Sequence, residues 1–230
     1  MIALAAAPVC AGPPYATDDP EPTDTGHWEI YNYVNGAHTP GDTSGEGGLD
    51  LNYGAAENLQ LTLVIPGSYD NGRVGAGVVE LAAKYKFLHQ SEGSWTPDVA
   101  FFPRVFAPTG TGFDPARPGL LLPIWAGKDF GPWSVFGGGG LMINPGKDQR
   151  NFWISGLVVT RDVTKTLQLG AEVYHQTAQS RDAADFTGVN LGAIWKFAGH
   201  WALLASGGPG VQNARRQGQY AFYAALEATY

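Results

Sequence analysis

The chain has 230 residues, of which 12% are aromatic and only 15% are charged, and its formal net charge is −7. Disordered chains have few aromatic and many charged residues, so this composition disfavours a disordered protein. The negative net charge disfavours a nucleic-acid-binding protein. The single cysteine, Cys10, excludes an internal disulfide and a cysteine-built zinc site. The length suits one large all-β domain, and no apolar run reaches the roughly 18 residues of a transmembrane helix.

Residues 1–11 resemble the end of a secretion signal. Val9 and Ala11 are the small residues expected before a cleavage at Gly12. The basic region that opens such signals is missing, which places the start of this sequence inside the expected signal. Leu is absent three residues before Cys10, so we do not predict lipidation there. An apolar tail without defined structure is the alternative interpretation.

Residues 12–25 are rich in carboxylates and contain Pro20 and Pro22. Prolines favour an extended conformation, so we predict a periplasmic strap or plug that folds into a barrel lumen or caps its mouth. The residues assigned to this N-terminal strap are Asp18, Asp19 and Trp28. Metal binding is disfavoured because the carboxylate spacing is not that of a known calcium loop.

The segment VVELAAKYKFL (78–88) can be interpreted as a helix or as a strand. Helix propensity is high, but a helical wheel places a lysine inside the apolar stripe. Alternation resolves the conflict, because Leu81, Tyr85 and Phe87 share an apolar face while Glu80 and Lys84 share the other, together with Lys86. Period-two alternation predicts a strand with one apolar and one wet face.

The same alternation recurs about twelve times along the chain. The expected strands are 26–36, 47–55, 59–67, 77–87, 98–107, 120–128, 133–142, 152–161, 166–176, 186–197, 200–206 and 219–230. Most are near the roughly 9–11 residues with which a tilted strand crosses a bilayer.

Short and long connections alternate between these strands. The longer connections are rich in Gly, Asp, Pro and Asn, and they are 37–46, 67–76, 108–119, 144–151, 177–185 and 207–218. The connection 89–97 is the one exception, because it is long where a short turn is expected. This alternation is typical of an outer-membrane barrel, with short periplasmic turns and longer external loops. We therefore predict that 26–230 form an antiparallel transmembrane up-and-down β-barrel of about 12 strands.

Alternation alone does not separate a lipid-facing barrel from a soluble sandwich. The expected signal and the final strand ending on the aromatic Tyr230 favour the bacterial outer membrane. Tryptophans near strand ends are also expected for interface girdles. They are Trp28, Trp125, Trp133, Trp153, Trp195 and Trp201. The expected partners are outer-membrane lipid, a small-molecule solute and, through the strand ending at Tyr230, the barrel-assembly machinery.

With the apolar faces turned to lipid, charged residues fall inside the barrel. The expected lumen-lining charges are Glu29, Asp50, Glu80, Lys84, Lys86, Arg104, Glu172, Lys196 and Glu227. They fit a selectivity lining or a salt-bridge network that rigidifies the barrel, and mixed signs favour the network. The expected lumen aromatics, either a path for aromatic solutes or space filling, are Tyr31, Tyr33, Phe102, Phe106 and Tyr223.

Catalytic and cofactor motifs are weak in this sequence. His175 alone is placed plausibly near a strand end, but no serine lies beside it and no G-x-S-x-G occurs. The run 137–140 (GGGG) lacks the lysine and helix of a phosphate loop. We predict neither an enzyme nor a cofactor.

Seven segments resemble the outer-membrane barrel family named for the meta pathway of phenol degradation. They are YATDDPEPTDTGHWEI (15–30), ENLQLTLVIPG (57–67), GAGVVELAAKYKFL (75–88), FFPRVFAPTG (101–110), LPIWAGKDFGPWSVFG (122–137), LQLGAEVYHQT (167–177) and HWALLASGGPGV (200–211). The first, third and fifth are the most specific. At Val78-Val79 the family more often has Gly-Asp. The resemblance implies an exported barrel that passes small, apolar or aromatic compounds.

Three hypotheses follow. The first is an outer-membrane channel or transporter for small apolar or aromatic compounds by passive diffusion. The second is a closed structural or ligand-binding barrel without flux. The third is a soluble exported β-sandwich or lipocalin-like binder, which would need no detergent for extraction.

Overall fold

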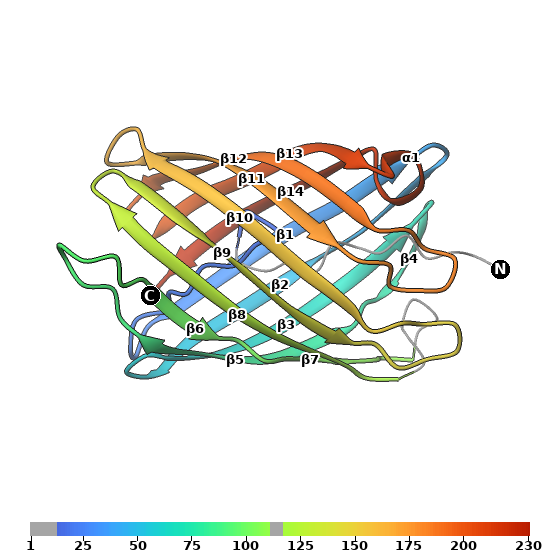
Figure 1. Cartoon of the computed structure of the whole chain (residues 1–230), viewed down its shortest axis with the longest axis horizontal. Coiled ribbons are helices and arrows are strands. Elements are labelled where there is room, and N and C mark those ends of the chain that lie inside the picture. Colours follow the sequence, from blue (N-terminus) through green and yellow to red (C-terminus); the bar gives the residue numbers. More distant parts are fainter. Residues whose placement is uncertain (1–12, 111–116) are drawn as a thin grey trace.

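The computed structural model describes residues 13–110 and 117–230, and the expected signal at 1–11 lies outside these ranges. The described chain forms a closed antiparallel β-barrel (Figure 1). Its strands are β1 (Trp28–Thr39), β2 (Asp42–Ala56), β3 (Leu59–Asp70), β4 (Arg73–Ala76), β5 (Val79–Leu88), β6 (Asp98–Phe101), β7 (Arg104–Ala107), β8 (Gly119–Phe130), β9 (Trp133–Ile143), β10 (Phe152–Asp162), β11 (Leu167–Gln176), β12 (Phe186–Ala198), β13 (Trp201–Gln212) and β14 (Tyr220–Thr229).

Twelve strands make the wall. The short strands β6 and β7 together occupy the one position between β5 and β8, and β4 pairs only with the end of β3. Sequential strands pair with each other, and β1 closes the barrel against β14 from Glu29↔Thr229 to His38↔Tyr220. The predicted up-and-down topology is confirmed. Among the described residues, no helix is long and apolar enough to cross a membrane.

The predicted strand 98–107 is interrupted at Phe102 and Pro103. Proline has no N–H to donate to a strand ladder, so pairing stops there. The wall stays joined because the Phe102 N–H donates to the Pro123 carbonyl (3.2 Å) and the Ala83 N–H donates to the Pro103 carbonyl (3.2 Å).

Two predicted long loops are wrong, and a third is shorter than predicted. Residues 37–46 continue the β1–β2 pairing up to Thr39↔Asp42, and residues 67–76 form the β3–β4 hairpin. The latter turns at Asn71-Gly72, both at positive φ, as a tight two-residue hairpin requires. Likewise β13 runs on to Gln212, before the short helix α1 (Ala214–Gln217). Glycine-rich, polar strand extensions look like loops in the sequence because they carry no apolar alternation.

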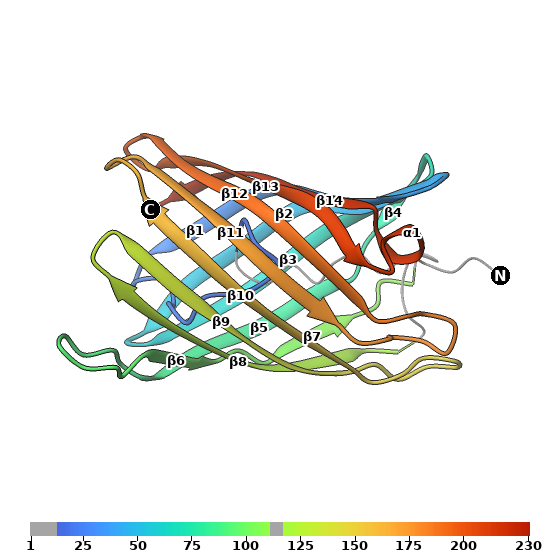
Figure 2. The ribbon, with the colours of Figure 1, turned by 45° about the horizontal axis from the view of Figure 1, so that its top comes forward.

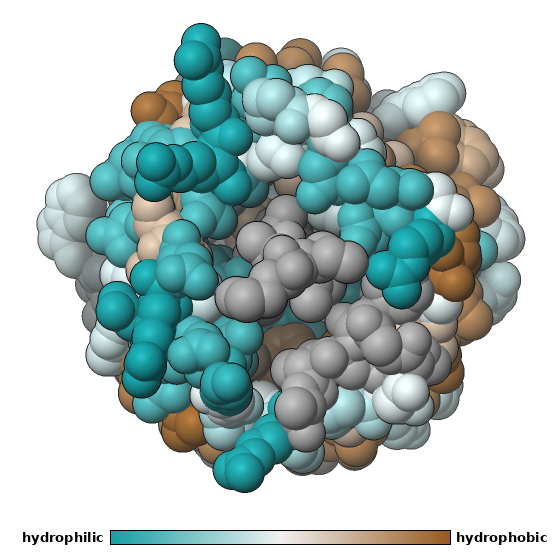
Figure 3. Space-filling view, turned by 90° about the vertical axis from the view of Figure 1, so that its right-hand side faces the viewer, coloured by the Kyte–Doolittle hydropathy of each residue, from teal (hydrophilic) through white to brown (hydrophobic). Residues whose placement is uncertain are grey.

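We call the barrel end with the short turns at 57–58, 131–132, 163–166 and 199–200 the turn end, and the opposite end the loop end. The turn end lies at the left of Figure 1, where β1 begins and β14 ends. Under the loop-length rule for outer-membrane barrels, we expect the turn end to face the periplasm. Figure 3 views the loop end, where hydrophilic residues gather around the opening and hydrophobic ones lie on the outer sides.

The outer surface carries the apolar faces of the strands. On β5, Leu81, Tyr85 and Phe87 are each more than half exposed, whereas Glu80 and Lys84 are buried inside. Tryptophans stand on the outer surface near the turn end (Trp28, Trp133, Trp195, Trp201) and near the loop end (Trp153). Such a surface suits lipid rather than water.

One predicted girdle tryptophan is misplaced. Trp125 is only 1% exposed and lies inside the barrel, where it belongs to a cluster with Phe102, Leu121, Met142, Phe152 and Ile154. We call this the tryptophan cluster. The error arose because both faces of β8 are apolar near Trp125, so its sequence could not show which face is inside.

Candidate functional site: a lumen crossed by the N-terminal strap

The strap, described here as residues 13–25, runs inside the barrel and leads to the start of β1 at the turn end (Figure 2). Its first part is held by β11–β13. Ser206 Oγ donates to the Pro14 carbonyl, and the backbone N–H groups of Ala16 and Thr17 donate to the Glu172 carboxylate at 3.2 and 2.6 Å. Asn190 Nδ2 adds a third donor to that carboxylate at 2.7 Å. Glu172 is therefore a buried acceptor for the strap backbone.

The middle of the strap is bound by charge to β5. Lys84 Nζ lies 2.8 Å from Asp18 Oδ1 and 3.7 Å from Asp19 Oδ1, and it also donates to the Glu21 carbonyl (3.2 Å). Lys86 Nζ lies 2.6 Å from Glu21 Oε1. The Lys84 and Asp18 side chains are only 6% and 2% exposed. Buried opposite charges of this kind are costly unless they are paired, which ties the strap to the wall.

The last part of the strap follows the wall to the turn end. The Thr23 N–H donates to Gln60 Oε1 (2.8 Å), and Thr25 makes a parallel β-bridge with Gly54. Trp28 belongs to β1 rather than to the strap, which corrects that part of the prediction. Its ring packs beside Tyr53 at 4.7 Å and is 42% exposed.

The barrel wall is shaped to receive the strap. At Gly156 on β10, a Cβ would overlap Thr17 Oγ1, and at Gly192 on β12 it would lie 2.6 Å from Tyr15 Cε1. Real Cβ atoms do not approach so closely, so a side chain at either position requires the Thr17 or Tyr15 side chain of the strap to shift. Burial, and after it the nearby Glu172 carboxylate, raises the pKa of the Tyr15 phenol.

A second buried ion pair lies on the wall itself. Arg104 Nε and Nη2 donate to the two Glu80 carboxylate oxygens at 2.7 and 2.8 Å, in a bidentate arrangement. The Phe102 ring lies under both cations, 5.0 Å from Lys84 Nζ and 5.3 Å from the Arg104 guanidinium carbon. Four of the predicted lumen charges, Glu80, Lys84, Lys86 and Arg104, thus gather on one side of the lumen.

The other predicted charges lie elsewhere on the inner wall. Asp50 accepts from Asn52 Nδ2 (2.8 Å), and Glu29 accepts from the Tyr31 hydroxyl (3.1 Å). Glu227 stands opposite both Tyr31 and Ala202, and Lys196 also stands opposite Ala202, so these residues form one row across the strands. Asp98 was not predicted, yet it is buried 3.9 Å from Lys86.

The predicted lumen aromatics form two groups rather than one continuous path. Tyr33 and Tyr223 stack with ring centroids 6.1 Å apart, in a cluster that also contains Tyr31. Phe102 belongs to the tryptophan cluster, with Phe106 packed against it.

The strap separates two cavities. The one nearer the turn end has about 460 Å³ of empty space, part of it open to solvent, and is polar. Its lining contains six carboxylates and two cations: Asp18, Asp19, Glu21, Glu29, Asp50, Glu80, Lys84 and Arg104. The other reaches the loop end, has about 660 Å³ of empty space, and is bounded at the strap by Ala16 and Thr17.

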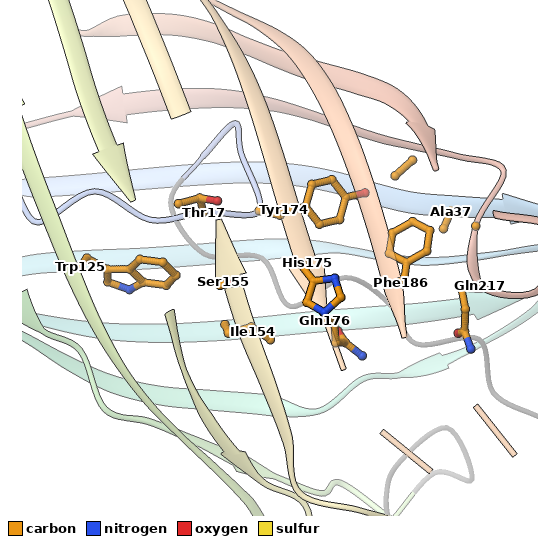
Figure 4. A pocket seen from close by; sticks show the side chains of 13 residues that line it. Thr17, Ala37, Trp125, Ile154, Ser155, Tyr174, His175, Gln176, Phe186 and Gln217 are labelled. Carbon is orange, nitrogen blue, oxygen red and sulfur yellow. The ribbon is translucent and has the colours of Figure 1, made fainter. Parts of the chain in front are cut away.

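The loop-end cavity is lined mainly by residues that the sequence analysis did not assign to the lumen. Figure 4 shows Trp125, Tyr174 and Phe186 around it, on three different strands. Its described lining has no Asp, Glu, Lys or Arg. Period-two alternation on β11 was the available signal, since Tyr174 shares a face with Glu172. His175 also lies on the lining of this cavity, and its Nδ1 lies 2.9 Å from Thr187 Oγ1.

Known structures share this architecture. The COG4313 outer membrane channel from Pseudomonas putida F1 superposes with a TM-score of 0.74 at 17% identity, over 92% of this chain and 98% of that one. An active-site mutant of outer membrane phospholipase A from Escherichia coli gives a TM-score of 0.50 at 14% identity, over 94% and 93% of the two chains. At these identities the likeness is one of fold.

The closed wall and its apolar exterior define the class of protein, a transmembrane β-barrel of the bacterial outer membrane. No protein-family model matches the chain, and no curated protein sequence matches it. The resemblance to the family named for phenol degradation therefore stays a prediction from the sequence.

Proposed function

We propose that this chain is an outer-membrane channel that passes small, neutral, apolar or aromatic solutes by diffusion, narrowed by its strap. The observation that carries the proposal is the pair of cavities on the two sides of one extended segment. A channel with a cavity on each side of a strap of thirteen described residues selects solutes by size where the strap crosses it. The fold shared with an outer membrane channel supports this function.

The charges favour neutral solutes. The turn-end cavity has more carboxylates than cations, so it disfavours anions, and the described lining of the loop-end cavity has no acid to hold a cation. Aromatic side chains line the loop-end cavity and give an apolar compound surface to pack against.

Solute flux tests the proposal directly. The protein would be placed in vesicles with lipopolysaccharide in the outer leaflet, which slows spontaneous entry of apolar compounds. We expect acetophenone to enter faster than in protein-free vesicles, and benzoate to gain much less. Equal rates with and without folded protein would reject a channel for such solutes.

The alternative is a closed barrel that holds a ligand without flux. The buried Asp18–Lys84 pair favours it, because a strap held by buried charges resists displacement. Saturable ligand binding without flux would select this alternative. Catalysis has less support: the His175 Nδ1 contact is to a threonine hydroxyl.

A further inference from the structure

The Trp125 indole is a buried hydrogen-bond donor on the lining of a cavity. The residue is 1% exposed, and no acceptor among the described residues lies within reach of its Nε1. An unmade hydrogen bond on a buried polar group is unfavourable, and native proteins leave few such groups. The strand alternation that buries Trp125 also places its ring in the loop-end cavity (Figure 4).

The surroundings of this donor are apolar and aromatic. The Phe186 and Tyr174 rings lie 5.8 Å apart at an interplanar angle of 57°, and Ile154 lies on the neighbouring β10. Gln176 and Gln217 supply uncharged polar groups on the described lining. Binding sites for small molecules combine these features: a mostly apolar wall and a few placed polar groups.

We infer that the loop-end cavity is a binding site for a neutral aromatic molecule that carries a hydrogen-bond-accepting oxygen, which Trp125 Nε1–H recognises. The ring of the ligand packs among Trp125, Tyr174 and Phe186, and its oxygen accepts the indole hydrogen. A carboxylate is disfavoured because no Lys or Arg lies on the described lining to pair with it. This inference deepens the proposed function, by naming where such a solute pauses and which atom selects it.

The test compares two ligands of similar shape, acetophenone and isopropylbenzene, which differ in the carbonyl oxygen. Binding to the refolded full chain would be measured by titration calorimetry in detergent micelles, with the heat of ligand uptake by empty micelles subtracted. Trp125→Phe keeps an aromatic ring and removes the N–H. The matched control is Trp153→Phe, because Trp153 is 58% exposed on the outer surface.

We expect Trp125→Phe to weaken acetophenone binding roughly 3- to 10-fold, as for one neutral hydrogen bond, with isopropylbenzene binding changed less than about twofold. Trp153→Phe should change neither. A second variant, Phe186→Leu, removes ring packing and should weaken both ligands.

Two results would overturn the inference. One is the absence of saturable acetophenone binding to protein that heat-modifiable gel mobility shows to be folded. The other is an equal loss for both ligands in Trp125→Phe, which would assign Trp125 to packing alone. If binding behaves as expected but the vesicles show no flux, the proposed channel function is refuted and the proposed binding site stands.

Discussion

Replacing Asp18 by Asn should release the strap. The change leaves the Lys84 ammonium in the wall, where its side chain is 6% exposed, without its 2.8 Å partner. Removing one member of a buried ion pair costs about 3–5 kcal/mol. The Asp19 carboxylate at 3.7 Å and the Glu21 carbonyl at 3.2 Å remain and compensate in part. We therefore take the net change as about 2–3 kcal/mol, or roughly 30- to 140-fold in the population with a displaced strap.

Cysteine labelling measures that population. Thr17 is 1% exposed in the seated strap, so a Thr17→Cys reporter, in a chain with Cys10→Ser, reacts with a maleimide only when the strap leaves the wall. The labelling rate should rise roughly 30- to 140-fold in Asp18→Asn. The matched control is Asp24→Asn, because Asp24 lies in the same segment with an exposed side chain.

A double variant separates the charge from its position. Lys84→Met in the Asp18→Asn background removes the unpaired cation and should recover part of the loss. The reasoning fails if Asp18→Asn and Asp24→Asn label at rates within about threefold of each other, because pairing with Lys84 would then contribute little.

Three other predictions concern the wall. Gly156→Ala places a Cβ onto Thr17 Oγ1. The strap should then leave the wall more often, and its proteolysis should become faster. Glu80→Gln leaves the buried Arg104 without its bidentate carboxylate and should destabilise the barrel by about 3–5 kcal/mol, seen as a lower temperature of the heat-modified gel shift. Leu81→Arg puts a cation on the lipid face and should cost about 2–4 kcal/mol if it lies at the bilayer midplane, measured by denaturant unfolding in vesicles.

Each variant has a control in the same chain. Gly67→Ala is the control for the glycine, since a Cβ there meets only ordinary contacts at 3.6 Å. Glu57→Gln changes an exposed carboxylate in a turn, and Glu92→Arg places an arginine at an exposed position outside the wall strands. A variant indistinguishable from its control would contradict the corresponding contact.

The barrel could be predicted from the sequence because its signal is local and repeated. The segment VVELAAKYKFL shows which residues face lipid without reference to any other strand, and alternating turns gave the strand number. Where both faces are apolar, as at LLLPIWA (120–126), alternation has no contrast, and Trp125 was assigned to the wrong side. Glycine-rich stretches hid the strand extensions for the same reason.

The partners of the strap could not be predicted because they depend on contacts far apart in the chain. Asp18 meets Lys84 across 66 residues, and Thr17 meets Glu172 across 155. The sequence shows acids near the N-terminus and lysines on β5, but not their register. Likewise, the sequence does not show that Gly156 leaves room for Thr17, because that contact exists only in the folded barrel.

Single-channel conductance in planar bilayers tests the central claim most directly, that this is a channel constricted by its strap. The refolded protein would be compared with a variant lacking residues 13–25. We predict discrete steps for the intact protein and a larger unit conductance after the deletion, because the two cavities then join. No conductance steps in either form, from protein shown to be folded by gel mobility, would contradict a channel and leave a closed barrel.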